Sequence, residues 1–278
     1  MKNLTYPEID NKSLWDAIVS RKHKVSRSKL KSVREKVMSR YDFYESHIDS
    51  LDNIVPLVPE EWGDAKETLM SCYGQNVEFK KVRKIIMDSL SATNRTKCPY
   101  CMLNRPNTID HFFDKNDYPE FSVYIPNLIP CCSECNTQKG TSMFDRCNNR
   151  EYIHFYYDKI PEDQFIFVRL SYLDGGVPFV NIELIFKQED YASKLIRRHF
   201  VSLSLIIKYR DVILERLAPV LEEIEMMLNV GIFPDIIKET LRIRYDSLVK
   251  CYGKNYWETC MYEGILNSPT FLEQILSV

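Results

Sequence analysis

Two Cys-x-x-Cys pairs constrain this chain more than any other feature. The first pair is Cys98 and Cys101, and the second is Cys132 and Cys135. Thiolates at positions i and i+3 can turn toward one ion, and two such pairs complete the four-sulfur tetrahedron of a structural zinc site. The pairs are separated by 30 residues, more than the roughly 15–20 of a common zinc ribbon. The insert is therefore expected to be a folded unit that carries the reactive groups.

Five motifs follow one another within residues 98–140: CPYC, Asp-His, Tyr-Pro-Glu-Phe, Asn-Leu and Cys-x-x-Cys-Asn-x-x-Lys-Gly. In this order the segment resembles the HNH endonucleases, in the subclass whose ββα-metal core is braced by a zinc knuckle. The resemblance implies a first strand over 108–112, a second over 127–130 and a helix from Cys132. Gly140 is then expected at or just past the end of that helix, where a left-handed residue costs little.

The polar side chains of this segment suit hydrolysis of a phosphodiester, which needs an activated water and a cation that neutralises developing charge. His111, with an ordinary pKa near neutrality, can take the proton of the water. Asp110 and Asn136 offer oxygen ligands to Mg²⁺, which keeps several waters and needs few protein ligands. By the resemblance, Asn127 holds the loop and orients the histidine. Asparagine at residue 136, where many members have histidine, favours Mg²⁺ or Mn²⁺ over a nitrogen-preferring metal.

Other polar groups near these motifs keep two interpretations each. Asp114 is expected to be a solvated loop carboxylate, with a further metal or water ligand as the alternative. Lys139 and Lys115 are as compatible with phosphate contacts as with the alternative, a charged helix end for Lys139 and a loop charge for Lys115. Cys131 competes with Cys132 for the zinc site, but the i, i+3 spacing favours Cys132.

Charge is distributed unevenly along the chain. The net charge is −2, yet residues 1–40 hold eleven Lys and Arg against four Asp and Glu, a net +7, which leaves −9 for the rest. The basic segment 21–36 is equally compatible with tracking a phosphate backbone and with a solvated helix face. With only eight glycines and no phosphate-cradling loop, an ATP-binding domain on this chain is not expected. Without a signal sequence or a membrane span, we expect a cytoplasmic protein with reduced cysteines and no membrane partner.

The flanks of the zinc motifs are predicted from periodicity and turn residues. Apolar residues recur at helical intervals over 28–54 and 60–92, which predicts two or three helices. A β-hairpin is predicted around Asp174-Gly175-Gly176, either extending the ββα sheet or covering it. The fold class is therefore α+β, a ββα-metal core with a zinc knuckle, helical flanks and a hairpin. Four regions are predicted: an N-terminal helical region with the basic segment (1–92), the nuclease core with the zinc site (93–150), a β-hairpin extension (151–187) and a C-terminal helical region (188–278).

The resemblance implies a Mg²⁺- or Mn²⁺-dependent HNH endonuclease that hydrolyses DNA, most directly double-stranded DNA. Its layout is similar to the nuclease subunits of antiphage defence systems such as Septu, in which an ATPase partner restrains or directs the nuclease. Two alternatives stay open. A nuclease toxin that cleaves RNA, for instance transfer RNA, uses the same catalytic set, and a non-catalytic zinc adaptor needs only the cysteines. A sequence-specific restriction enzyme needs a groove-reading element, and none is recognisable.

Overall fold

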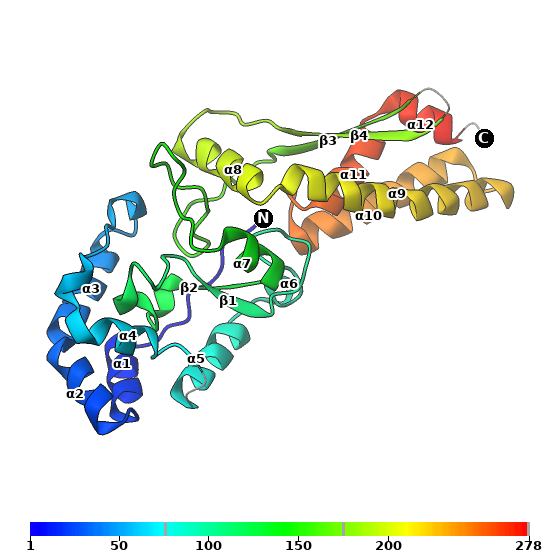
Figure 1. Cartoon of the computed structure of the whole chain (residues 1–278). Coiled ribbons are helices and arrows are strands. Elements are labelled where there is room, and N and C mark those ends of the chain that lie inside the picture. The colour runs from blue at the N-terminus through cyan, green and yellow to red at the C-terminus, as the bar shows by residue number, and fades with distance from the viewer. Residues whose placement is uncertain (75–76, 174–175, 277–278) are drawn as a thin grey trace. The chain divides into compact units, whose positions relative to one another are not determined.

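The computed structural model describes residues 1–74, 77–173 and 176–276 (Figure 1). These residues form a mixed α+β structure in which helices predominate and the strands make two small sheets. The chain divides into two compact units. The N-terminal unit is Asn3–Lys159, and the C-terminal unit is Ile160–Val278 together with Met1–Lys2. In the described part of the chain, no helix is both long and apolar enough to cross a lipid bilayer.

Helices dominate the first half of the N-terminal unit. They are α1 (Asn11–Ser20), α2 (Lys24–Ser32), α3 (Arg34–Ser46), α4 (Lys66–Met70), α5 (Val77–Asp88) and α6 (Ala92–Thr96), with 3₁₀ turns at Leu51–Asn53, Pro59–Glu61 and Gly63–Ala65. The sequence prediction missed α1, although Asp10 caps it by accepting hydrogen bonds from the N–H groups of Lys12 and Ser13. The periodic stretch 60–92 is not one helix, because Gly63 adopts a φ of +47° and a regular helix begins only at α4.

The expected order of a strand, a second strand and a short helix follows α6. Strand β1 (Thr108–His111) pairs antiparallel with β2 (Leu128–Cys131), and α7 (Ser133–Lys139) comes directly afterwards. These bounds differ from the predicted ones by a residue or so at each end. Gly140 ends α7 with a φ of +56°, so the predicted left-handed helix end is confirmed.

An aromatic core lies beneath the loop that joins β1 to β2. The ring of Tyr44, on α3, packs edge-on against Phe113, Phe121 and Tyr124 at centroid distances of 5.7, 5.0 and 5.1 Å. Its hydroxyl lies 3.0 Å from Nε2 of His154, which is fully buried. His154 is therefore a packed core residue. Edge-to-face pairs of this kind add about 0.5–1.5 kcal/mol each beyond burial, so the loop has a well-determined position.

The C-terminal unit contains a hairpin and five helices in its described residues. The hairpin strands β3 (Ile166–Tyr172) and β4 (Pro178–Leu184) pair with each other and form a separate sheet. The prediction that the hairpin extends the β1–β2 sheet is therefore wrong. Two residues of the predicted turn, Asp174 and Gly175, lie outside the described residues. The helices are α8 (Tyr191–Ser202), α9 (Leu205–Asn229), α10 (Pro234–Tyr252), α11 (Trp257–Leu266) and α12 (Pro269–Leu276).

The hairpin is covered by α11, which approaches β3 very closely. A Cβ atom at Gly264 would lie 2.7 Å from the carbonyl oxygen of Val168, so this contact excludes a side chain. Helix α9 continues through Pro219 without ending. Helix α10 starts at Pro234 and ends before Gly253, which has a φ of +87°. Apolar packing of helices on one hairpin face accounts for the wide apolar stripe in this half of the sequence.

Candidate functional site

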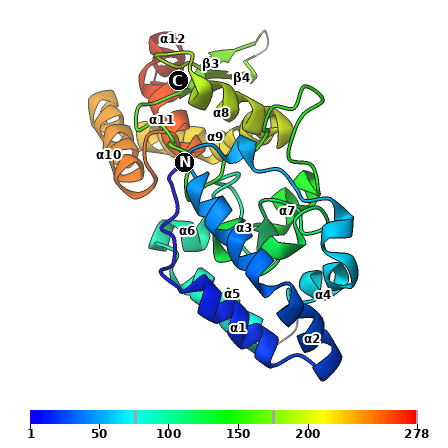
Figure 2. The same ribbon diagram turned by 90° about the vertical axis from the view of Figure 1, so that its left-hand side faces the viewer.

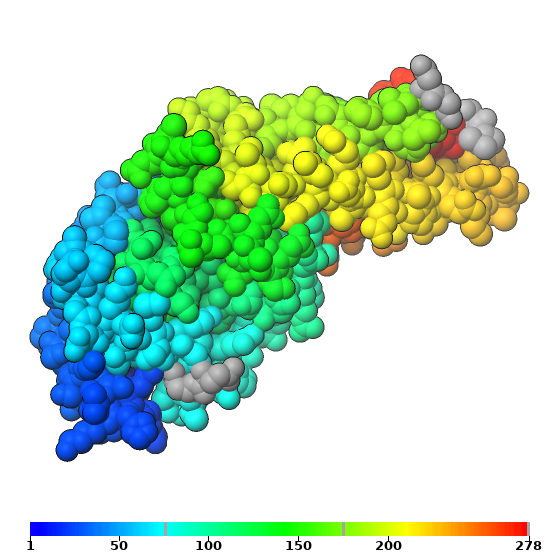
Figure 3. Space-filling model, viewed as in Figure 1, coloured from blue at the N-terminus to red at the C-terminus, as the bar shows by residue number. Residues whose placement is uncertain are grey.

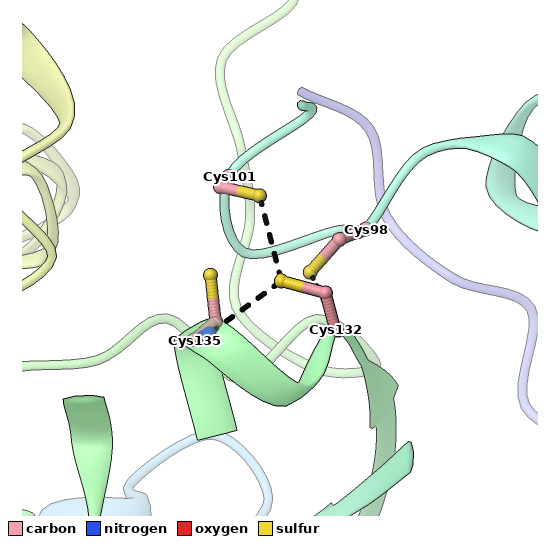
Figure 4. Close-up of side chains that lie close together, drawn as sticks. All are labelled: Cys98, Cys101, Cys132 and Cys135. Carbon is pink, nitrogen blue, oxygen red and sulfur yellow. Dashed lines mark hydrogen bonds between the residues drawn. The ribbon is translucent and has the colours of Figure 1, made fainter. Parts of the chain in front are cut away.

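The four paired cysteines meet in one buried cluster. Cys98 and Cys101 lie in the loop after α6, Cys132 caps α7, and Cys135 lies in its first turn (Figure 4). Their Sγ atoms are all within 4.8 Å of one another, and those of Cys101 and Cys132 are 3.9 Å apart. A tetrahedral zinc with Zn–S bonds of about 2.3 Å separates its sulfurs by about 3.8 Å. The cluster therefore fits a zinc ion, as the spacing predicted.

Backbone N–H groups point at these sulfurs. The N–H of Cys132 donates to Sγ of Cys98 at 3.2 Å, and the N–H of Cys135 donates to Sγ of Cys132 at 3.5 Å. Burial raises the pKa of the Cys98 thiol well above its usual range, so a cation is needed to keep buried thiolates charged. Cys131 lies on β2 opposite Thr108, outside the cluster, which confirms Cys132 as the fourth cysteine.

Asp110, predicted as a magnesium ligand, lies on β1 and its side chain is buried, with 3% of the residue exposed. The hydroxyl of Tyr100 donates to its Oδ2 at 2.7 Å, and Nζ of Lys139 lies 3.1 Å from each carboxylate oxygen. Lys139 is itself 2% exposed. Lys139 is the last residue of α7, as the charged helix end predicted, but its ammonium is a buried counter-ion of Asp110.

The two donors to Asp110 come from the two segments that a zinc ion would tie together. Tyr100 lies between Cys98 and Cys101, and Lys139 follows Cys135 by four residues on α7. Residues at i and i+4 share one face of a helix, so the spacing from Cys135 already indicated that Lys139 points inward. The tyrosine gave no such signal. The segments that carry the four cysteines thereby hold Asp110 through two separate contacts.

His111 ends β1 and is half-buried. Its Nε2 lies 2.9 Å from the carbonyl oxygen of Ser122, and a carbonyl can only accept, so we assign the proton to Nε2 and the lone pair to Nδ1. Burial lowers the pKa of His111 to about 4. The imidazole is therefore neutral at pH 7. The ring of Tyr73 packs against it at a centroid distance of 4.2 Å.

Asn127 is fully buried and holds the backbone just after the histidine. Its Oδ1 accepts a hydrogen bond from the N–H of Phe113 at 2.8 Å, and its Nδ2 donates to the carbonyl of the same residue at 2.9 Å. This pair of bonds ties the start of the loop to the residue before β2. The geometry agrees with a residue that orients His111 through the loop.

Asn136 lies on α7 beside β1. Its Nδ2 donates to Oγ1 of Thr108 at 3.5 Å, which leaves Oδ1 to accept from another group or to bind a cation. Thr108 and Asp110 are two residues apart on a strand and therefore share one face. Asn136 thus flanks the face of β1 that carries Asp110.

Asp110 and His111 share their charged neighbours. Nζ of Lys139 also donates to the carbonyl of His111 at 2.9 Å. The charges of Lys139 and Asp114 act on the pKa of both residues. Asp114 accepts a hydrogen bond from the N–H of Asn116 at 2.8 Å within its own loop. The structure therefore gathers the predicted site residues on one strand–strand–helix unit, close to the cysteine cluster.

Comparison with known proteins gives two partial similarities. The chain is 27% identical over 224 residues to protein ea31 of Escherichia phage lambda, which covers 76% of this chain and 75% of that protein. It is 30% identical over 100 residues to the Septu protein PtuB of Bacillus thuringiensis, over 34% of this chain and 37% of that protein. No protein-family model matches the chain, and no solved structure matches it. The similarity to a Septu protein agrees with the expectation from the sequence layout.

Proposed function

We propose that this chain is a metal-dependent nuclease of the HNH type, built on a ββα-metal core. The observation that carries the proposal is the state of His111. Its imidazole is neutral, its Nε2 donates to the carbonyl of Ser122, and the buried carboxylate of Asp110 is its neighbour in sequence. A base that works at neutral pH needs a free lone pair, and this histidine has one on Nδ1. The four-cysteine cluster supports the proposal as the brace of the same unit.

Each residue has a separate task in this proposal. His111 accepts the proton of the attacking water at Nδ1, while Ser122 holds the ring by its other nitrogen. Asn127 fixes the backbone that follows the histidine. Tyr100 and Lys139 hold Asp110 in place. Together these contacts restrict the ring and the carboxylate to one relative arrangement, as positioning for catalysis requires.

The donor set suits a hard divalent cation such as Mg²⁺ or Mn²⁺. A carboxylate offers about four lone-pair positions, and Tyr100 and Lys139 use three of those of Asp110. The fourth lone-pair position of Asp110 and Oδ1 of Asn136 offer the oxygen ligands that Mg²⁺ prefers. Such a cation supplies charge stabilisation for the phosphate and the leaving oxygen.

The similarity to the Septu protein supports a role in antiphage defence. In that role we propose that the chain acts with a partner ATPase and cleaves DNA, most directly double-stranded DNA. The +7 charge of the first 40 residues favours a polyanionic substrate over a small one.

The test is incubation of the purified, zinc-loaded protein with supercoiled plasmid and with total RNA, with and without added Mg²⁺. We expect plasmid cleavage that requires Mg²⁺. His111→Ala should lower the rate by about 10²–10⁴-fold, with zinc content and circular dichroism unchanged. His47→Ala, a matched change at the end of α3, should leave the rate intact.

Each outcome has a distinct meaning. Cleavage of RNA alone would keep the mechanism and replace the substrate. Full activity in His111→Ala would remove the proposed base. Inactivity on both substrates, with or without an ATPase encoded by a neighbouring gene, would leave a non-catalytic zinc adaptor.

A further inference from the structure

Helix α2 carries a row of cations with no acid on the same helix. Its sequence is KVSRSKLKS, and Lys24, Arg27 and Lys31 are spaced i, i+3 and i+7. Residues at this spacing share one face of a helix. All three are exposed at the surface. Figure 2 shows α2 following α1 at one end of the N-terminal unit, and Figure 3 shows the same residues in blue at its surface.

Two of these cations line a cavity of about 510 Å³ between α1, α2 and the start of α3. The lining residues are Asp16, Val19, Ser20, Arg27, Lys31 and Arg34. Val19 is buried and forms an apolar wall, whereas Ser20, Arg27 and Lys31 are exposed. The cavity is therefore open to solvent and lined on one side by positive charge.

The charges of the lining do not cancel. Arg34 forms two hydrogen bonds with Asp16, at 2.8 and 2.6 Å, and one with Glu35 at 3.1 Å, so the charge of Arg34 is compensated. Arg27 donates through Nε and Nη2 to the carbonyl of Lys22, which carries no compensating charge. No ion pair involves Arg27 or Lys31 in the part of the chain that the structure describes. The cavity thus retains two uncompensated positive charges.

We propose that this α1–α2 cavity binds the phosphate backbone of a nucleic acid and anchors the substrate apart from the catalytic strand. Arg27 and Lys31 have no anionic partner among the described residues and are hydrated while the cavity is open. Phosphate oxygens that enter the cavity supply the negative charge that pairs with them. Residues 1–40, which contain this cavity, have a net charge of +7, and residues 41–278 have a net charge of −9, so a polyanion is attracted to the first region. The substrate identity rests on the proposed nuclease function.

Binding can be measured without cleavage. The zinc-loaded protein, without added Mg²⁺, is titrated into a fluorescein-labelled 30-base-pair duplex, and anisotropy is followed from 50 to 200 mM KCl. Each phosphate that is neutralised contributes about 0.9 to the slope of log K against log[salt]. Arg27→Ala/Lys31→Ala should therefore reduce the slope by about 1.8, which is roughly a 60-fold loss of affinity at 0.1 M salt.

The matched control is Lys81→Ala/Lys84→Ala on α5. It removes the same charge from exposed side chains of the same unit, but these lysines pair with Glu78 and Asp88 on their own helix. It should leave the slope almost unchanged. An equal loss of affinity and of salt slope in both double variants would show a non-specific effect of charge. That result would overturn the proposed phosphate-binding role of the α1–α2 cavity.

The remaining outcomes separate the anchor from the nuclease. A wild-type protein that binds the duplex through Arg27 and Lys31, but cleaves nothing with Mg²⁺, would keep the anchor and refute the nuclease function. A wild-type protein that does not bind the duplex would overturn the anchor. So would binding to phosphatidylserine vesicles or to polyglutamate in place of nucleic acid.

Discussion

Replacing Lys139 by methionine removes the cation beside Asp110 but keeps a side chain of similar length. The carboxylate and the ammonium are 3% and 2% exposed, respectively, so water cannot replace the lost partner. Removing one member of a buried ion pair typically costs about 3–5 kcal/mol of folding free energy. The hydrogen bond from Nζ to the carbonyl of His111 is lost as well, at about 1 kcal/mol. We therefore expect Lys139→Met to lower the free energy of unfolding by about 4 kcal/mol at pH 7.

The size of this loss should depend on pH. Burial raises the pKa of Asp110, and the charge of Lys139 opposes that rise. Without the lysine, the pKa of the folded carboxyl rises further above its value in the unfolded chain. The folded variant then binds more protons than the unfolded chain. The free energy of unfolding that Lys139→Met loses therefore becomes smaller as the pH falls through the pKa of the folded carboxyl. Asp110→Asn/Lys139→Met leaves no buried charge at these two positions and should be more stable than Lys139→Met alone.

The assay is urea denaturation of zinc-loaded protein, followed by tryptophan fluorescence in a Trp257→Phe background. The remaining tryptophans, Trp15 and Trp62, are both buried in the N-terminal unit. Lys81→Met, whose side chain is 63% exposed, is the control and should cost less than about 0.5 kcal/mol. A loss under 1 kcal/mol for Lys139→Met at pH 7, or a loss that does not change with pH, would refute the buried ion pair.

Two further predictions concern the base and the cysteine cluster. Because burial lowers the pKa of His111 to about 4, His111 loses its proton at about pH 4 as the pH rises, so the cleavage rate should lack the inflection near pH 6.5 of an ordinary histidine. An inflection at 6.5 in a pH–rate profile would contradict this. Cys98→Ser removes one of four sulfurs and should lose zinc, measured by metal analysis, and with it the folded N-terminal unit, measured by circular dichroism. Full zinc occupancy in this variant would exclude the four-cysteine site.

Local spacing was sufficient to predict the zinc cluster and the elements around it. Cys98, Cys101, Cys132 and Cys135 meet because i, i+3 pairs in a tight loop and at a helix start turn their side chains the same way. Gly140 ends the helix because an L-residue is strained at its positive φ. Each cysteine pair and the helix end depend on backbone geometry over a few residues. The two pairs, 30 residues apart, were expected to meet because one zinc ion takes four ligands.

The partners of charged side chains were decided by the tertiary structure. The sequence predicted Lys139 as a charged helix end or a phosphate contact, and it is buried because α7 packs on β1 and brings it to Asp110. Glu120, in the Tyr-Pro-Glu-Phe motif, is buried and its Oε1 accepts from Nε of Arg40 at 2.7 Å, across 80 positions of sequence. Burial of a charge depends on what lies opposite it. A local spacing can indicate that a side chain points inward, but it does not identify the partner.

The role of the hairpin was likewise decided by packing. Alternating apolar residues and a glycine turn indicated two paired strands, and β3 and β4 form them. The same pattern did not reveal which neighbour the apolar face would bury, because any apolar surface of matching shape serves equally well. Close contact of α11 with β3 at Gly264 made the hairpin part of the C-terminal unit. The sequence thus determined the local elements and the metal-binding cysteines, whereas long-range packing determined which charges are buried and which surfaces meet.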